Sequence, residues 1–80
     1  MKNFFYKNIS QFKVITRYDD GKKTTEHTIL DMDAVSATSK ALDRDEKAGN
    51  IPANVNNAIH TVTVNGVSVE PEIETIFKTS

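Results

Sequence analysis

The sequence predicts an α+β domain in which two β-hairpins flank one helix, a ββαββ order. Val, Ile and Thr supply 23 of the 80 residues, against two Leu, and their stiff side chains suit the pleated surface of a strand. Asp20-Gly21 and Asn65-Gly66 are dipeptides typical of two-residue hairpin turns, and residues 33–48 between them have helical spacing. We therefore expect a four-stranded antiparallel sheet with the helix packed on one face.

The first hairpin is predicted from the alternation of apolar and polar side chains in residues 11–18. A turn at Asp20-Gly21 pairs Tyr18 with Lys23 and brings the following strand beside the first. In that register one face of the hairpin belongs to the core and the other faces solvent. The predicted core face holds Phe12, Val14, His27 and Ile29, and the outer face holds Lys13, Arg17, Thr24 and Thr28.

The second hairpin turns at Asn65-Gly66, which pairs Val64 with Val67 and Val62 with Val69. Valines on one side and polar residues on the other are typical of a sheet with one dry and one wet face. His60 falls on the valine side, and the polar face carries Thr61, Thr63, Ser68 and Glu70.

The helix is predicted over residues 33–48 from its end residues and spacing. The Asp33 carboxylate can cap free N–H groups at its start, Lys47 is spaced to pair with Asp43 in its last turns, and Gly49 suits a left-handed cap. Small side chains on the apolar face allow close approach to a sheet. That face comprises Ala34, Val35, Ala37, Thr38, Ala41, Leu42 and Ala48, and the solvated face is expected to hold Asp43, Asp45 and Glu46.

Three segments have weaker patterns. Residues 50–58, which contain four Asn, indicate a loop or one irregular turn. The tail from Pro71 fits either a short helix, from the spacing of its apolar residues, or an added strand, from its β-branched content. The N-terminal Phe4-Phe5-Tyr6 either prolongs the first strand or forms an exposed aromatic patch.

Composition limits the class of protein. A hydrophobic fraction of 38% and a charged fraction of 26% are typical of a globular chain, and the length fits one domain, residues 1–80. The absence of Cys excludes disulfides, zinc–thiolate sites and thiol catalysis. No apolar run approaches the roughly 20 residues of a membrane helix, and the first residues do not fit a signal peptide. We expect a cytoplasmic protein that does not contact a membrane.

No pattern indicates catalysis or a cofactor. The acidic residues of the helix and tail are explained by solvated faces, and there is no nucleophile elbow or glycine-rich phosphate loop. His27 and His60 fall on apolar strand faces and, with Asp31, could form a metal set. No short spacing ties the two histidines together, so they are interpreted as residues at the margin of the core. The sequence predicts a non-enzymatic protein with no metal and no cofactor.

Charge is segregated along the chain. Residues 1–25 carry six cations and two anions, whereas residues 26–80 carry four cations and nine anions, which together give the net charge of −1. The predicted partner-binding residues are Phe4, Phe5, Tyr6, Lys13, Arg17, Lys22 and Lys23. The preferred hypothesis is a protein-binding module that works through open hairpin edges and the termini, by strand addition or homodimerisation. The alternative is RNA or single-stranded DNA binding by the basic hairpin.

Residue usage adds a resemblance in kind. Phe, Tyr, Met, Ile, Asn and Lys, which have AT-rich codons, number 30, against 13 Gly, Ala, Arg and Pro. With the short length and the absence of motifs, this resembles small bacteriophage accessory proteins. The resemblance implies a chain that inhibits or regulates a host protein or defence complex by occlusion.

Overall fold

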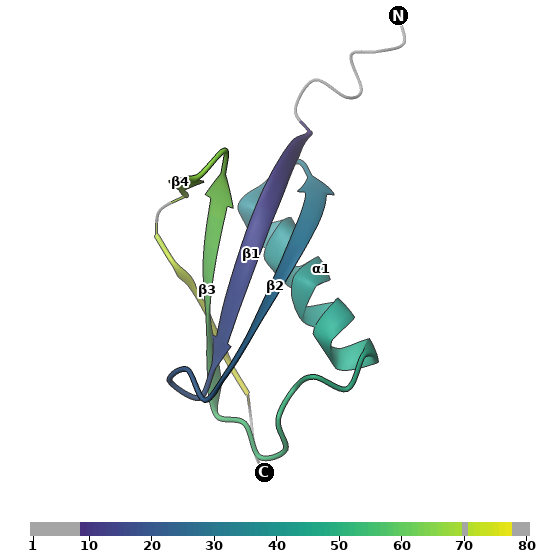
Figure 1. Cartoon of the computed structure of the whole chain (residues 1–80), viewed down its shortest axis with the longest axis vertical. Coiled ribbons are helices and arrows are strands. Elements are labelled where there is room, and N and C mark those ends of the chain that lie inside the picture. Colours follow the sequence, from purple (N-terminus) through teal and green to yellow (C-terminus); the bar gives the residue numbers. More distant parts are fainter. Residues whose placement is uncertain (1–8, 70, 78–80) are drawn as a thin grey trace, which may run out of the picture.

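The computed structural model describes residues 9–69 and 71–77 and confirms the α+β fold. Its elements follow the chain as two strands, a helix and three further strands (Figure 1). They are β1 (Ser10–Tyr18), β2 (Lys23–Asp31), α1 (Ala34–Lys47), β3 (Asn57–Val64), β4 (Val67–Ser68) and β5 (Ile73–Ile76). The tail is therefore a strand, which decides between the two alternatives for that segment.

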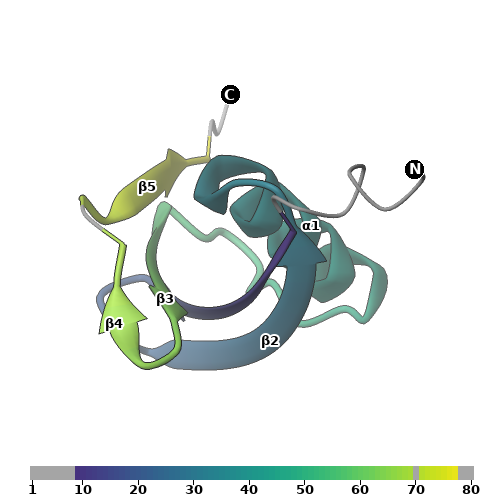
Figure 2. The ribbon, with the colours of Figure 1, turned by 90° about the horizontal axis from the view of Figure 1, so that it is seen from above.

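The sheet has the order β2-β1-β3-β4, and β5 pairs with the same side of β3 as β4 does. Every pairing is antiparallel. The β4 pairing covers the C-terminal end of β3, and the β5 pairing covers its N-terminal end. Figure 2 shows the sheet curving around α1, so the helix fills the concave face and the outer face is convex.

The registers of both hairpins are as predicted. Tyr18 lies opposite Lys23 in the first hairpin, and Val64 lies opposite Val67 in the second. Asn65 and Gly66 form the expected two-residue turn, with φ of 54° and 80°. The two-residue turn predicted at Asp20-Gly21 is wrong, because the first loop takes the four residues 19–22. Its left-handed φ values begin at Asp19 (51°), since aspartate tolerates this conformation.

Helix α1 begins and ends where the sequence predicts. The Asp33 carboxylate accepts a 2.7 Å hydrogen bond from the Ser36 N–H at the first turn. At the last turn, Gly49 has a φ of 73°, and the N–H groups of Gly49 and Asn50 donate to the carbonyls of Glu46 and Asp45. This is the pattern of a Schellman cap, which satisfies carbonyls that the helix leaves free.

The apolar core lies between α1 and the concave face of the sheet. One cluster comprises Phe12, Val14, Ile29, Ala37, Ala41 and Val62, and a second comprises Tyr18, Val55 and Ala58. Three details differ from the predictions. Val35 and Ala48 are exposed rather than part of the apolar helix face. Val35 lies on the side of α1 away from the buried stripe, and Ala48 is the cap that follows the last helical residue. The loop ends at residue 56, because Asn57 and Ala58 already pair with β1 or β5. Val67 at the second turn is also exposed.

Within residues 9–69 and 71–77, no helix is long and apolar enough to span a membrane.

Candidate functional site

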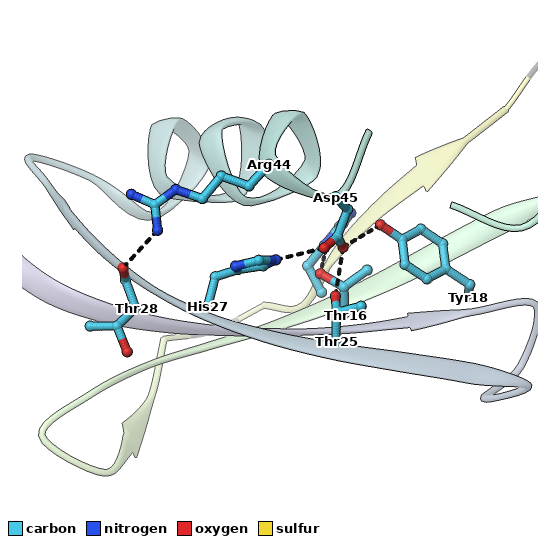
Figure 3. A network of polar contacts seen from close by, with 8 residues as sticks. Thr16, Tyr18, Thr25, His27, Thr28, Arg44 and Asp45 are labelled. Carbon is cyan, nitrogen blue, oxygen red and sulfur yellow. Dashed lines mark hydrogen bonds and ion pairs between the residues drawn. The ribbon is translucent and has the colours of Figure 1, made fainter. Parts of the chain in front are cut away.

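A buried carboxylate lies at the centre of the interface between helix and sheet. Asp45 is on α1 and has no exposed surface. Its Oδ2 accepts hydrogen bonds of 2.6 Å from the hydroxyls of Tyr18 and Thr25, and its Oδ1 lies 2.6 Å from Nε2 of His27 (Figure 3). One helix side chain therefore holds three residues from both strands of the first hairpin.

The donors keep Asp45 ionised. Burial alone would raise the pKa of Asp45, but the hydrogen bonds from His27, Thr25 and Tyr18 outweigh it and hold the pKa below its usual range. The effect on Tyr18 is the opposite one. Burial and the hydrogen bond to Asp45 raise the pKa of Tyr18 well above its ordinary value. The network is therefore one carboxylate surrounded by groups that donate to it.

His60 forms a second polar link next to the first. It is fully buried, and its ring nitrogens lie 2.8 Å from the hydroxyls of Thr16 and Thr75. These residues belong to β1 and β5, so the imidazole on β3 joins both strands that flank it. Burial lowers the pKa of His60, and the charge of Asp45 acts in the opposite direction. The neutral imidazole fits, because it can donate to one hydroxyl and accept from the other.

The network connects α1 to both strands of the first hairpin. A carboxylate paired with histidine is also the geometry of a general base, and the His27 side chain is 20% exposed. A general base needs a cavity that brings substrate to it. An open basin of about 890 Å³ lies at the hairpin tip, and neither His27 nor Asp45 lines it. His27 and Asp45 therefore lie apart from this basin.

The metal set considered from the sequence is not assembled. Asp31 accepts a hydrogen bond from the Met32 N–H and pairs with Lys40 at 3.0 Å, whereas His27 and His60 bond to the partners given above. Among the residues that the structure describes, no group of three or more His, Cys, Asp or Glu side chains is placed to hold a metal ion.

The predicted partner-binding residues are not gathered in one place. Lys13 and Arg17 lie exposed on the convex face, where they pair with Glu26 at 3.5 Å and Glu72 at 3.2 Å. The loop residue Lys22 and the neighbouring Lys23 line the basin at the hairpin tip, together with Asp19 and Asp20. The remaining three, Phe4, Phe5 and Tyr6, lie outside the described residues.

The outer edge of β2 is a further candidate surface. The carbonyl of Tyr18 accepts from the N–H groups of Gly21 and Lys22, whereas the N–H of Asp19 donates to Asn57 at the start of β3. Successive residues of a strand direct their backbone groups to opposite neighbours, so Tyr18 and every second residue of β1 bond to β2. With the observed register, four residues of β2 direct their N–H and C=O groups away from the sheet. They are Thr24, Glu26, Thr28 and Leu30.

One side chain reaches this edge. Nη1 of Arg44, on α1, donates a 3.3 Å hydrogen bond to the Thr28 carbonyl (Figure 3). This contact is consistent with a Thr28 carbonyl that is not used by β1. In the described part of the chain, β2 has no strand on its outer side. Leu30, Met32 and Val35, at the end of β2 and the start of α1, add exposed apolar surface.

The prediction that Asp45 lies on the solvated helix face is wrong. Asp45 is buried because it continues the stripe of Ala37, Thr38 and Ala41 that faces the sheet. Asp45 follows Ala41 by four residues, and this helical spacing indicates that the two side chains lie on the same face. A carboxylate can take this position because the hairpin supplies hydroxyl and imidazole donors.

Comparison with protein-family models, with curated proteins and with solved structures finds no match for this chain.

Proposed function

We propose that this chain is a small, non-enzymatic protein-binding module that acts by occluding part of a partner protein. The observation that supports it is the outer edge of β2. Nine residues long, this strand offers the outward N–H and C=O groups of four residues to an incoming strand. Strand addition of this kind uses main-chain hydrogen bonds for affinity and side-chain contacts for specificity.

The sequence of β2 suits this use. Natural proteins commonly guard an open edge with Pro, a bulge or a very short strand. β2 contains no Pro, and its pairing with β1 runs without interruption from Lys23 to Asp31. The exposed Leu30 and Met32 at its end offer apolar contacts beside the main-chain groups.

Charge pairing on the convex face partly neutralises the cations there. Lys13 and Arg17, the two cations on the convex face from which a nucleic-acid site was considered, each have a carboxylate within 3.5 Å. Phosphate binding relies on cations that are available to replace counterions. The resemblance in composition to bacteriophage accessory proteins supports a cytoplasmic inhibitor or regulator of a host protein or defence complex.

The test compares two substitutions of one edge residue. Thr28→Pro removes an N–H that points away from the sheet, so the pairing with β1 is kept, while Thr28→Ala leaves the main chain intact. Tagged wild-type protein and Thr28→Ala are expected to retain the same defined protein from a bacterial host extract in high salt, and Thr28→Pro is expected to lose it. Equal retention by Thr28→Pro would show that the edge is not the contact, and retention of nucleic acid alone would favour the alternative function.

A further inference from the structure

We propose that the β2 edge pairs with the β2 edge of a second copy of this chain, antiparallel and centred on His27. The inference rests on the proposed function, because it names a partner for the same edge. The two sheets then form one continuous sheet across a two-fold axis at the edge.

Backbone direction restricts the registers of such a pair. An incoming strand bonds only to the outward groups of Thr24, Glu26, Thr28 and Leu30, so each of these residues must face one of the same set on the other copy. Three registers with substantial overlap satisfy this condition. They are centred on Glu26, on His27 and on Thr28.

Overlap and charge select the register centred on His27. It pairs all nine residues of β2 with β2 of the second copy, whereas the registers centred on Glu26 or Thr28 each leave two residues of the strand without a partner. It also sets Glu26 opposite the neutral Thr28 of the other copy. The register centred on Glu26 instead sets two glutamates directly opposite each other, which is unfavourable.

The need to cover this edge gives the pairing its physical basis. An open edge with β-branched residues and no Pro is a template for other chains. Among the outward groups of β2, only the Thr28 carbonyl has a side-chain donor in the described residues, and that donor is Arg44. A carbonyl has two lone pairs, so Thr28 can accept from a second copy while it accepts from Arg44. Self-pairing covers the same groups that a partner strand uses, and the two events therefore compete.

Cysteine pairs test the register directly, because the natural chain has no Cys. In the proposed register Thr24 lies opposite Leu30 of the other copy, at the roughly 5.5 Å Cα separation of a hydrogen-bonded pair, which a disulfide can bridge. Within one chain the two residues are six positions apart, about 20 Å, so an intrachain disulfide cannot form. Both residues are exposed.

The double variant Thr24→Cys/Leu30→Cys is expected to give a covalent dimer under mild oxidation. Each single variant is expected to stay monomeric on a non-reducing gel, and a mixture of the two is expected to cross-link. The control pair Thr24→Cys/Thr28→Cys reports the register centred on Glu26 and is expected to cross-link far less. Sedimentation equilibrium of the wild type is expected to show a concentration-dependent dimer, which Thr28→Pro weakens about tenfold or more.

The outcomes separate this inference from the proposed function. A monomer at millimolar concentration, together with no cross-link in the Thr24→Cys/Leu30→Cys variant, would overturn the self-pairing, and loss of a captured partner in Thr28→Pro would still support the binding module. A dimer in the proposed register, with partner capture that Thr28→Pro leaves unchanged, would support the self-pairing and refute the partner's use of this edge.

Discussion

The hydroxyl of Tyr18 donates a 2.6 Å hydrogen bond to the carboxylate of Asp45. The two residues are 27 positions apart, one on β1 and the other near the end of α1. With Thr25 and His27 on the same carboxylate, this bond fixes how the helix sits on the hairpin. A chain of this size has a small apolar core, and the buried polar link adds three contacts between the helix and the hairpin.

Asp45→Asn is expected to lower the free energy of unfolding by roughly 2 to 4 kcal/mol. The amide keeps the size of the side chain, but it removes the charge and sets an NH₂ donor against groups that themselves donate. Asp43→Asn, on the exposed side of the same helix where it pairs with Lys47, is the matched control and should change stability by less than about 0.5 kcal/mol. Urea denaturation of both variants measures the difference, and equal shifts would refute a special role for Asp45.

Tyr18 is expected to stay protonated in alkaline solution until the protein unfolds. Burial and Asp45 both raise the pKa of its hydroxyl, whereas an ordinary tyrosine titrates near pH 10. The chain has two tyrosines, so the absorbance of phenolate should rise late for one of them. Tyr18→Phe should remove this late step. A wild-type titration in which both tyrosines ionise near pH 10 in the folded protein would contradict the buried hydrogen bond.

The sequence predicts the hairpins well because their signals are local. Alternation from Phe12 to Tyr18 together with a turn residue sets the register, and the pairing of Tyr18 with Lys23 tolerates a longer loop than the predicted one. Asn65-Gly66 determines its turn almost alone, since both residues must adopt positive φ.

The buried polar network depends on contacts between distant residues, and the sequence alone does not predict it. An aspartate in a helix usually lies at the surface. The burial of Asp45 becomes favourable only because Tyr18, Thr25 and His27, from the first hairpin, form hydrogen bonds with its carboxylate. β5 is similar. The tail forms a strand rather than a helix because one side of β3, from Asn57 to His60, is free to pair with it.

Stability is expected to fall as the pH drops below about 6.5, because His60 is buried as a neutral imidazole. Its pKa in the folded protein is lower than the ordinary value of 6.5, so the unfolded chain binds more protons in this range. The contribution is complete above pH 6.5 and is lost as the pH falls toward the folded pKa. Denaturation midpoints measured at a series of pH values between 7.5 and 4.5 test this. The midpoint should begin to fall near the pKa of an ordinary histidine.

His60→Gln separates this effect from other titrations. The variant is expected to be less stable at every pH, because the hydrogen bonds to Thr16 and Thr75 are not reproduced in full. Its stability should nevertheless change less than that of the wild type between neutral and mildly acidic pH. An unchanged slope in the variant would show that His60 does not carry the pH dependence.

Arg44→Ala is expected to strengthen self-association while leaving folding stability nearly unchanged. The guanidinium lies at the surface and, among the residues that the structure describes, makes one long hydrogen bond, to the Thr28 carbonyl, so its loss should cost less than about 0.5 kcal/mol. Without it, the outward carbonyl at the middle of β2 loses its side-chain donor among the described residues, and this side chain no longer stands in the way of a second copy at the edge.

Lys47→Ala is the control, because Lys47 is an exposed cation of the same helix that pairs with Asp43. Sedimentation equilibrium should show tighter dimers for Arg44→Ala and unchanged dimers for Lys47→Ala. Equal behaviour of the two variants would mean that Arg44 does not guard the edge.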